Sequence, residues 1–360
     1  MPLPHGPART PLPRDAATDA GGAAPLGDLP VWNLDDLYAA EDAPALAEDL
    51  TAAEAEAKAM AEAYEGKLAG LSGDALAEAV ARYEGLQQRL GRVMSYAGLR
   101  HYQDTVDAGR AKFLGDMQTR VTDLTAPTVF FTLELNTLED AALEAKLAES
   151  EALRRYRPWL DRLRAFKPHQ LSQELETFLH DQSVVGASAW NRLFDETMAR
   201  LTFDVEGEDG PLSLEPTLTM LSDPDRGKRE RAAQALTTVF QANLPLFSRI
   251  MNTLVKEHEI EGRWRKMPTA QHGRHLSNHV EPEVVQALRD AVVQAYPRLS
   301  HRYYAMKAKR LGLETLEFWD RNAPLPDDDD KLVGWDEARQ IVNDAYAAFD
   351  PRMAEIAEPF

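Results

Sequence analysis

The chain has 360 residues, enough for one large domain or two ordinary domains with a sizeable buried core. Lys and Arg number 40 and Asp and Glu 59, and the resulting formal charge of −19 argues against nucleic acid and anionic membranes as main partners. The absence of cysteine excludes disulfides, thiolate zinc sites and cysteine nucleophiles, and it fits a reducing cytoplasm, where we expect the protein to act. No apolar run approaches the ~18 residues that span a bilayer.

The first 30 residues differ in composition from the rest of the chain. They contain seven prolines and four glycines, and they lack the apolar core of a secretory signal. This composition predicts a disordered tail over residues 1–30, with a docking segment as the alternative.

Residues 31–200 follow a helical pattern. Order is expected to begin near "VWNLDDLY", residues 31–38, and the helical spacing begins at Pro44. In the next segment the apolar residues lie three or four positions apart; they are Leu76, Val80, Tyr83, Leu86 and Leu90. Ser72 is a weak helix-cap signal ahead of them. Similar stretches cover 106–135, 138–148, 150–166, 171–182 and 186–200. We therefore predict an N-terminal helical domain, 31–200, built as a bundle of antiparallel helices.

Residues 201–221 break this pattern. Phe203 and Val205 alternate with polar residues, Leu212 and Leu214 do the same after "GEDG", and the segment predicts a small β-hairpin. A helix is then expected with Asp223 as its N-cap and Pro224 in its first position. It should run, kinked at Pro245, to about Trp264. Pro282 marks the start of another helix.

The end of the chain carries a regular apolar face. Asp350 and Pro351 are expected to open a new helix. The face consists of positions spaced 4, 3, 4, 3 and 4 apart: Val342, Tyr346, Phe349, Met353, Ile356 and Phe360. Such a face needs a partner. Because the pattern runs to the last residue, we interpret residues 201–360 as the first part of a larger domain, with a short native C-terminal helix as the alternative.

One histidine begins a pattern seen in zinc proteases. His258 and Glu259 start like H-E-x-x-H, in which both histidines bind zinc and the Glu acts as general base. Position 262 is Gly, so the second ligand is missing. Glu259 with Arg263, and Glu261 with Arg265, instead form i,i+4 pairs typical of a solvated helix face.

Two further segments resemble metal sites less closely. His272, His275 and His279 have metal-ligand spacing, but the Glu of H-E-x-x-H is absent and nearby Pro268 and Gly273 favour a loop or extended segment. "DDDDK", residues 327–331, lacks the alternation and glycine of a calcium loop and reads as solvated. No catalytic, cofactor-binding or metal-binding residue is assigned in this chain, since no self-contained constellation of any of these kinds is present.

Several long stretches resemble one family. They are "WNLDDLY", "LTFDVEGEDGPLSLEPTLTMLSDPDRGKRERAAQAL", "KEHEIEGRWRKMPTAQHGRHLSNHVEPEVVQALRDAV" and "HRYYAMKAKRLGLETLEFWDRNAPLP". Together they resemble oligoendopeptidase F, a branch of the thimet-oligopeptidase-like zinc metallopeptidases, from about Val31 to Phe360. The resemblance implies a mainly helical fold with two lobes around a deep channel, and cleavage of short peptides inside it. It also implies zinc as cofactor, held by the histidines of H-E-x-x-H and a later Glu.

The sequence departs from that family at the motif itself, because H-E-x-x-H occurs nowhere in the 360 residues. In the family the motif follows the region that resembles "DPRMAEIAEPF". We therefore interpret the chain as the N-terminal portion of a zinc metalloendopeptidase, inactive alone. The alternative is a non-catalytic helical scaffold or peptide-binding module derived from such an enzyme. A third interpretation is a metalloprotein that uses His272, His275 and His279. Peptide specificity and oligomeric state are not encoded in any pattern of the sequence.

Overall fold

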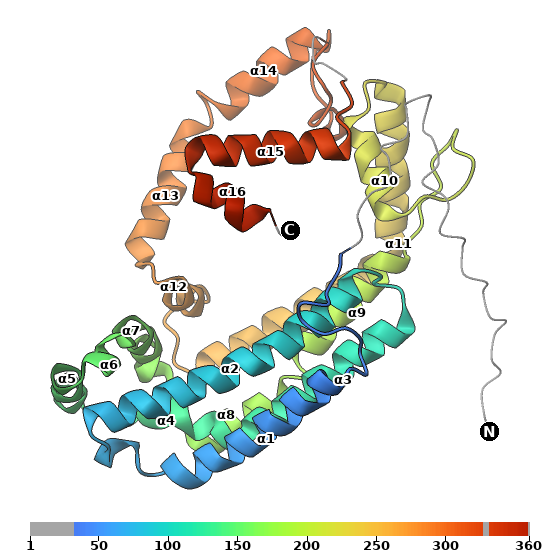
Figure 1. The fold of residues 1–360 in the computed structure, drawn as a ribbon. Coiled ribbons are helices and arrows are strands. Elements are labelled where there is room, and N and C mark those ends of the chain that lie inside the picture. The colour runs from blue at the N-terminus through green and yellow to red at the C-terminus, as the bar shows by residue number, and fades with distance from the viewer. Residues whose placement is uncertain (1–31, 327–330, 359–360) are drawn as a thin grey trace. The chain divides into compact units, whose positions relative to one another are not determined.

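The computed structural model describes residues 32–326 and 331–358 and is mainly helical there, as predicted (Figure 1). The chain divides into two compact units, residues 33–326 and a second unit that contains the last two helices. The predicted disordered tail, residues 1–30, lies outside the described residues. No helix within the described residues is long and apolar enough to span a bilayer.

The first part of the larger unit is a bundle of helices close to the predicted ranges. The helices are α1 (Pro44–Tyr64), α2 (Gly73–Tyr102), α3 (Ala108–Thr125), α4 (Val129–Thr137), α5 (Asp140–Glu149), α6 (Glu151–Arg154), α7 (Arg157–Ala165), α8 (Gln173–Gln182) and α9 (Ala187–Arg200). Short 3₁₀ turns join them: η1 (Leu68–Gly70), η2 (Ala126–Thr128) and η3 (Lys167–His169). Ser72, the weak signal, does cap α2, since its hydroxyl accepts a hydrogen bond from the Ala75 amide at 3.3 Å.

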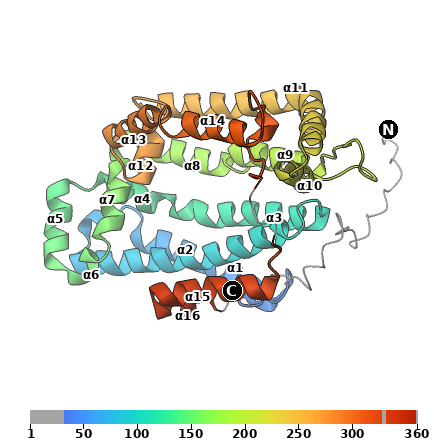
Figure 2. The ribbon, with the colours of Figure 1, turned by 90° about the horizontal axis from the view of Figure 1, so that it is seen from above.

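The core of this bundle lies where α1, α2 and α3 run side by side, and α4, α5, α6 and α7 contribute further buried side chains to it (Figure 2). The apolar spacing predicted Leu76, Val80, Leu86 and Leu90 to face inward, and all four are buried. Phe131 of α4 is fully buried, and its ring stacks on that of Tyr83 at 4.7 Å between centroids. Apolar burial is thus the main stabilising term of this region.

The predicted β-hairpin is reduced to a single pair of residues. Phe203 and Leu212 exchange two backbone hydrogen bonds of 2.8 and 2.9 Å, and no named strand forms among the described residues. Phe203 and Val205 are nevertheless buried, so the alternation correctly identified an inward face. The ladder does not extend because α10 (Leu214–Thr219) begins immediately after the pair, followed by η4 (Met220–Ser222).

The longest helix, α11, runs from Arg226 to Trp264, and it ends where the sequence predicted. It starts two residues later than expected: Asp225, not Asp223, is the N-cap and accepts from the Gly227 amide at 2.7 Å. Pro224 therefore lies outside the helix. Pro245 is inside it, and α11 changes direction between its yellow and orange parts in Figure 1, because proline removes one helical hydrogen bond.

After α11 the unit continues through α12 (His272–Asn278), α13 (Pro282–Ala295) and α14 (Ser300–Arg310) to η5 (Phe318–Asp320). Pro282 opens α13 as predicted. None of the residues of α13 is buried, and the exposed apolar ones include Val284, Leu288 and Val293.

The second unit contains α15 (Trp335–Phe349) and α16 (Pro351–Ala357), which pack on each other. Asp350 caps α16 as predicted, accepting from the Arg352 amide at 2.9 Å. The described part of the predicted apolar face is exposed, from 36% at Tyr346 to 84% at Phe349. Phe360 lies outside the described residues.

Candidate functional site

His258 lies on an exposed turn of α11 and is engaged in a structural contact. Its Nε2–H donates to the Ala270 carbonyl at 2.8 Å, which fastens the loop after α11 to the helix. The predicted neighbouring pairs both form: Arg263 donates to Glu259 at 3.3 Å, and Arg265 donates to Glu261 at 2.7 Å.

The segment with His272, His275 and His279 is helical as far as residue 278, which corrects the expected loop. It forms α12, and His279 ends the helix in a left-handed conformation with φ of 53°. The imidazole of His279 accepts from Arg162 at 2.7 Å, whereas the ring of His272 packs edge-on against His169 at 5.0 Å. The outer two histidines thus contact different neighbours.

The residues that the structure describes do not fit a zinc ion. Among them, no group of three or more His, Cys, Asp or Glu side chains is arranged to hold a metal. Asp327–Asp330 lie outside the described residues. No step of a metal-dependent reaction can therefore be assigned to the described side chains.

Three hollows line the C-terminal half of α11. The first, the apolar groove, has a volume of about 730 Å³ between α8, α9 and α11. Phe178, Val185 and Trp264 line it, and they are 60%, 68% and 57% exposed. Exposed aromatic and branched side chains in a concave surface are typical of a place where a ligand or partner binds.

The second hollow, the amide cavity, lies between α4, α7, η3, α11 and α12 and also measures about 730 Å³. Asn136, His169, Gln170 and His258 contribute to its wall. The third, the hydroxyl cavity, measures about 650 Å³ and is lined by several Thr and Ser residues around His180. There the Thr125 hydroxyl lies 2.9 Å from His180 Nε2.

A pair of charged side chains separates the amide cavity from the hydroxyl cavity. Arg265 of α11 donates two hydrogen bonds, of 2.6 and 2.9 Å, to the carboxylate of Glu176 on α8. Partial burial raises the pKa of Glu176, but the hydrogen bonds from Arg265 and from the Leu171 amide outweigh it and hold the pKa below its ordinary value. The Arg265 pKa is raised, chiefly by its hydrogen bond to Glu176. Both groups are therefore charged at neutral pH and fix α8 against α11.

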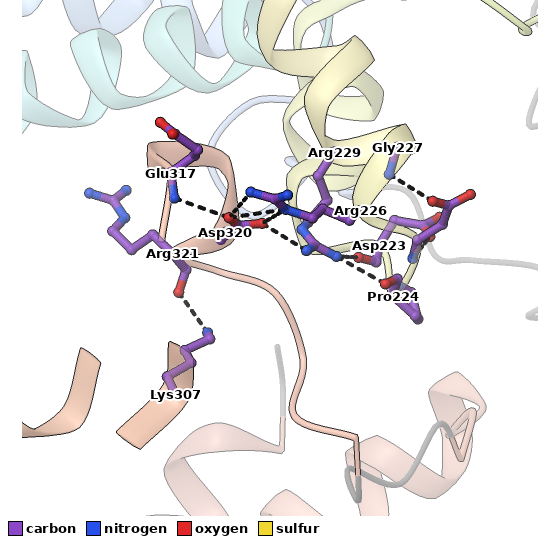
Figure 3. Close-up of polar contacts among 10 residues, drawn as sticks. Asp223, Pro224, Arg226, Gly227, Arg229, Lys307, Glu317, Asp320 and Arg321 are labelled. Carbon is purple, nitrogen blue, oxygen red and sulfur yellow. Dashed lines mark hydrogen bonds and ion pairs between the residues drawn. The ribbon is translucent and has the colours of Figure 1, made fainter. Parts of the chain in front are cut away.

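The most strongly perturbed carboxylate of the larger unit lies elsewhere, at η5 (Figure 3). Asp320 is fully buried and accepts from Arg226 at 3.0 Å and from Arg229 at 2.9 Å, both on the first turn of α11. Burial raises the Asp320 pKa, and the two arginines and the Glu317 amide outweigh burial and lower it to about 2.

The neighbours of this carboxylate show its role (Figure 3). Arg229 also donates to the carbonyls of Asp223 and Pro224 at 2.8 and 2.9 Å, just before α11. Lys307 of α14 donates to the Arg321 carbonyl at 2.7 Å. We name Asp320, Arg226 and Arg229 the Asp320 clamp. It holds the segment after α14 against the start of α11, and because the buried Asp320 carboxylate pairs with both arginines the clamp is structural.

Sequence reasoning missed both charged clusters. Glu176 and Arg265 are 89 positions apart, and Asp320 and Arg229 are 91 apart. The i,i+4 rule identified only the local partner of Arg265, namely Glu261. No local pattern signals pairing over such separations, so the sequence offered no indication of either cluster.

Two segments of the chain match known families. Residues 134–203 match the family described as Oligopeptidase F, and residues 219–326 match Peptidase family M3. The chain is 27% identical over 300 residues to Oligopeptidase PepF of Bacillus subtilis, an alignment that covers 81% of this chain and 44% of PepF. It is 26% identical over 274 residues to the group B oligopeptidase PepB of Streptococcus agalactiae, covering 75% of this chain and 45% of PepB.

The fold is similar to solved peptidase structures. Oligoendopeptidase-F from Enterococcus faecium superposes with a TM-score of 0.71 at 21% identity, over 86% of this chain and 64% of that one. The family matches and the similar relatives support the assignment that the sequence stretches predicted, to the M3 peptidases and, within them, to the oligoendopeptidase F family. The chain spans about half the length of the two bacterial relatives named above.

Proposed function

We propose that the chain forms the N-terminal part of a zinc-dependent oligopeptidase that hydrolyses internal bonds of short peptides. The observation that carries the proposal is the order of the two matches, Oligopeptidase F at residues 134–203 and then Peptidase family M3 at 219–326. The relatives that align with most of this chain are themselves named oligopeptidases.

In this proposal residues 31–200 form the helical N-terminal domain and residues 201–360 begin the catalytic domain. The protein acts in the cytoplasm, and two lobes enclose the channel in which peptides bind. The zinc, when bound in the whole enzyme, supplies a water activated for attack on the peptide carbonyl. Its ligands are proposed to lie outside the 360 residues, because H-E-x-x-H is absent from this sequence. These 360 residues contribute a rigid wall of the channel, which the Glu176–Arg265 pair and the Asp320 clamp stabilise.

The alternative is a non-catalytic peptide-binding module, and the apolar groove favours it. Phe178, Val185 and Trp264 offer an open apolar surface. Such a module should melt cooperatively and stay soluble by itself. A portion of a larger enzyme should aggregate through exposed residues such as Leu288 and Phe349.

The test is made on the purified 360-residue chain. Its zinc content is measured by elemental analysis, and its activity by cleavage of a quenched fluorescent peptide. We expect less than stoichiometric zinc and no cleavage. Stoichiometric zinc together with cleavage that a chelator abolishes would place the catalytic site within these residues and overturn the proposal.

A further inference from the structure

The apolar groove runs along one face of the C-terminal half of α11. The residues of α11 that line it recur every three or four positions, from Arg249 to Trp264. This spacing places them on one side of the helix, over a length of about 22 Å. The groove is therefore elongated, and its two ends can be considered separately.

The other wall of the groove consists of α8 and α9, which run antiparallel to α11. Glu176 of α8 pairs with Arg265, just past the end of α11. The ring of Phe194 on α9 packs edge-on against that of Phe247, with 5.7 Å between centroids. One end of the groove thus lies beside α8, and the other end lies beside α9.

The end beside α8 is apolar and open. Phe178 and Trp264 line it and are 60% and 57% exposed, and Leu175 and Ile260 beside them are 37% and 39% exposed. Because these four side chains share one concave surface, a ligand with apolar side chains would remove apolar area from water on both sides of the contact.

The opposite end of the groove holds the side chain of Arg249. This residue is exposed, and its guanidinium makes no hydrogen bond or ion pair with any residue that the structure describes. Its own helix offers no acidic neighbour, because none of the positions three or four residues away is Asp or Glu; they are Pro245, Leu246, Asn252 and Thr253. The guanidinium is therefore available to an anionic group.

The other charged side chains of the groove are engaged. Lys256 donates to Glu259 at 2.7 Å, and Glu261 accepts from Arg265 at 2.7 Å. Glu257 accepts from the first backbone amide of α9 at 3.2 Å, and it lies eight positions from the guanidinium, about 12 Å along the helix. The available charge at the end beside α9 is thus positive.

We propose that the apolar groove binds the carboxyl-terminal residues of an apolar peptide, with the terminal carboxylate on Arg249 and apolar side chains against Trp264. A guanidinium group matches a carboxylate, to which it can donate two parallel hydrogen bonds. The amide side chains of Gln182 and Asn252 also line the groove and can pair with peptide bonds between the two ends. A fatty acid would leave these amides unused. The choice of peptides as the ligand class rests on the proposed function.

The test uses isothermal titration of the 360-residue chain with four probes. They are N-acetyl-Phe-Ala-Leu-Ala-Ala as the free acid, the same peptide with an amidated carboxyl end, N-acetylated pentaalanine as the free acid, and decanoate. We expect the first probe to bind at least about threefold more tightly than its amide, because an exposed ion pair is lost. It should bind about tenfold more tightly than acetylated pentaalanine, which lacks the large apolar side chains.

Two variants separate the ends of the groove. Arg249→Gln should lower the affinity of the free acid to that of the amide and leave the amide unchanged. Trp264→Ala should weaken both forms by the same factor. Both side chains are exposed, so neither change should prevent folding. Arg302→Gln, at an exposed arginine of α14 that does not line the groove, is the control and should bind as the unchanged chain does.

Three outcomes would overturn the proposal. They are equal binding of the free acid and the amide, equal weakening of both forms by Arg249→Gln, and no binding of any probe. Decanoate binding as tight as that of the free acid would assign the groove to fatty acids and overturn the choice of a peptide. Binding is measured without cleavage, so the result is independent of the zinc and activity test above.

Discussion

Residues 33–200 and residues 201–326 are stabilised in different ways. The first region has one continuous apolar core that extends from Tyr38 to Leu160. The second has a small core around Phe203, Val205, Ala235 and Leu236, and α13 buries none of its residues. In the second region the Asp320 clamp instead holds the segment after α14 against the start of α11. The first region is therefore stabilised mainly by apolar burial, whereas the second depends on polar contacts and leaves apolar surface open.

The largest expected effect comes from creating a cavity in the core of residues 33–200. Phe131→Ala removes a fully buried ring that stacks on Tyr83, and we expect it to lower the free energy of unfolding by about 3–5 kcal/mol. Urea denaturation of the 360-residue chain measures this. The control is Leu288→Ala on α13, where the side chain is 65% exposed and the change should stay within about 0.5 kcal/mol. Equal losses in both variants would refute the contrast between the regions.

The next effect comes from breaking the clamp. Asp320→Ala leaves Arg229, which is 2% exposed, buried without its carboxylate, and we expect a loss of about 3 kcal/mol. Hydrogen exchange should show faster exchange in the segment after α14, with little change in α1 and α2. Asp290→Ala is the matched control, since its pair with Arg289 is exposed. Equally faster hydrogen exchange in both regions would show that the effect of the clamp is not confined to residues 201–326.

The smallest expected effect is a pH dependence. The Asp320 pKa is lowered to about 2 in the folded chain, so its stabilising contribution is present above the ordinary Asp pKa near 4 and is lost as pH falls toward 2. We expect the unfolding free energy to decline between about pH 4 and pH 2, and Asp320→Asn to flatten that part of the profile. An identical acid profile in Asp320→Asn and in the unchanged chain would contradict the assignment.

The sequence predicted the helices of the first region well because their cores follow local periodicity, as Leu76, Val80 and Leu86 illustrate. It misjudged the start of α11 because "SDPD" offers two aspartates, and the one nearer the helix, Asp225, forms the cap. It also mistook α12 for a loop. Gly273 lies in the first turn of that short helix, where it is tolerated.

The candidate site was less predictable than the fold. Glu176 with Arg265, and Asp320 with Arg229, come together only through tertiary packing. Periodicity reports which face of a helix is apolar, but not which distant side chain will approach it. In contrast, the sequence alone showed that "EHEIEG" is not a zinc motif, because Gly262 stands where the second histidine is needed.

We propose, as the central point, that these residues belong to a peptidase whose zinc ligands lie beyond them. The most direct measurement is to read the coding DNA past codon 360. We predict an in-frame continuation that encodes H-E-x-x-H and, further on, a Glu suited to complete the zinc site. A stop codon immediately after Phe360 would contradict the claim and favour a binding module of peptidase ancestry.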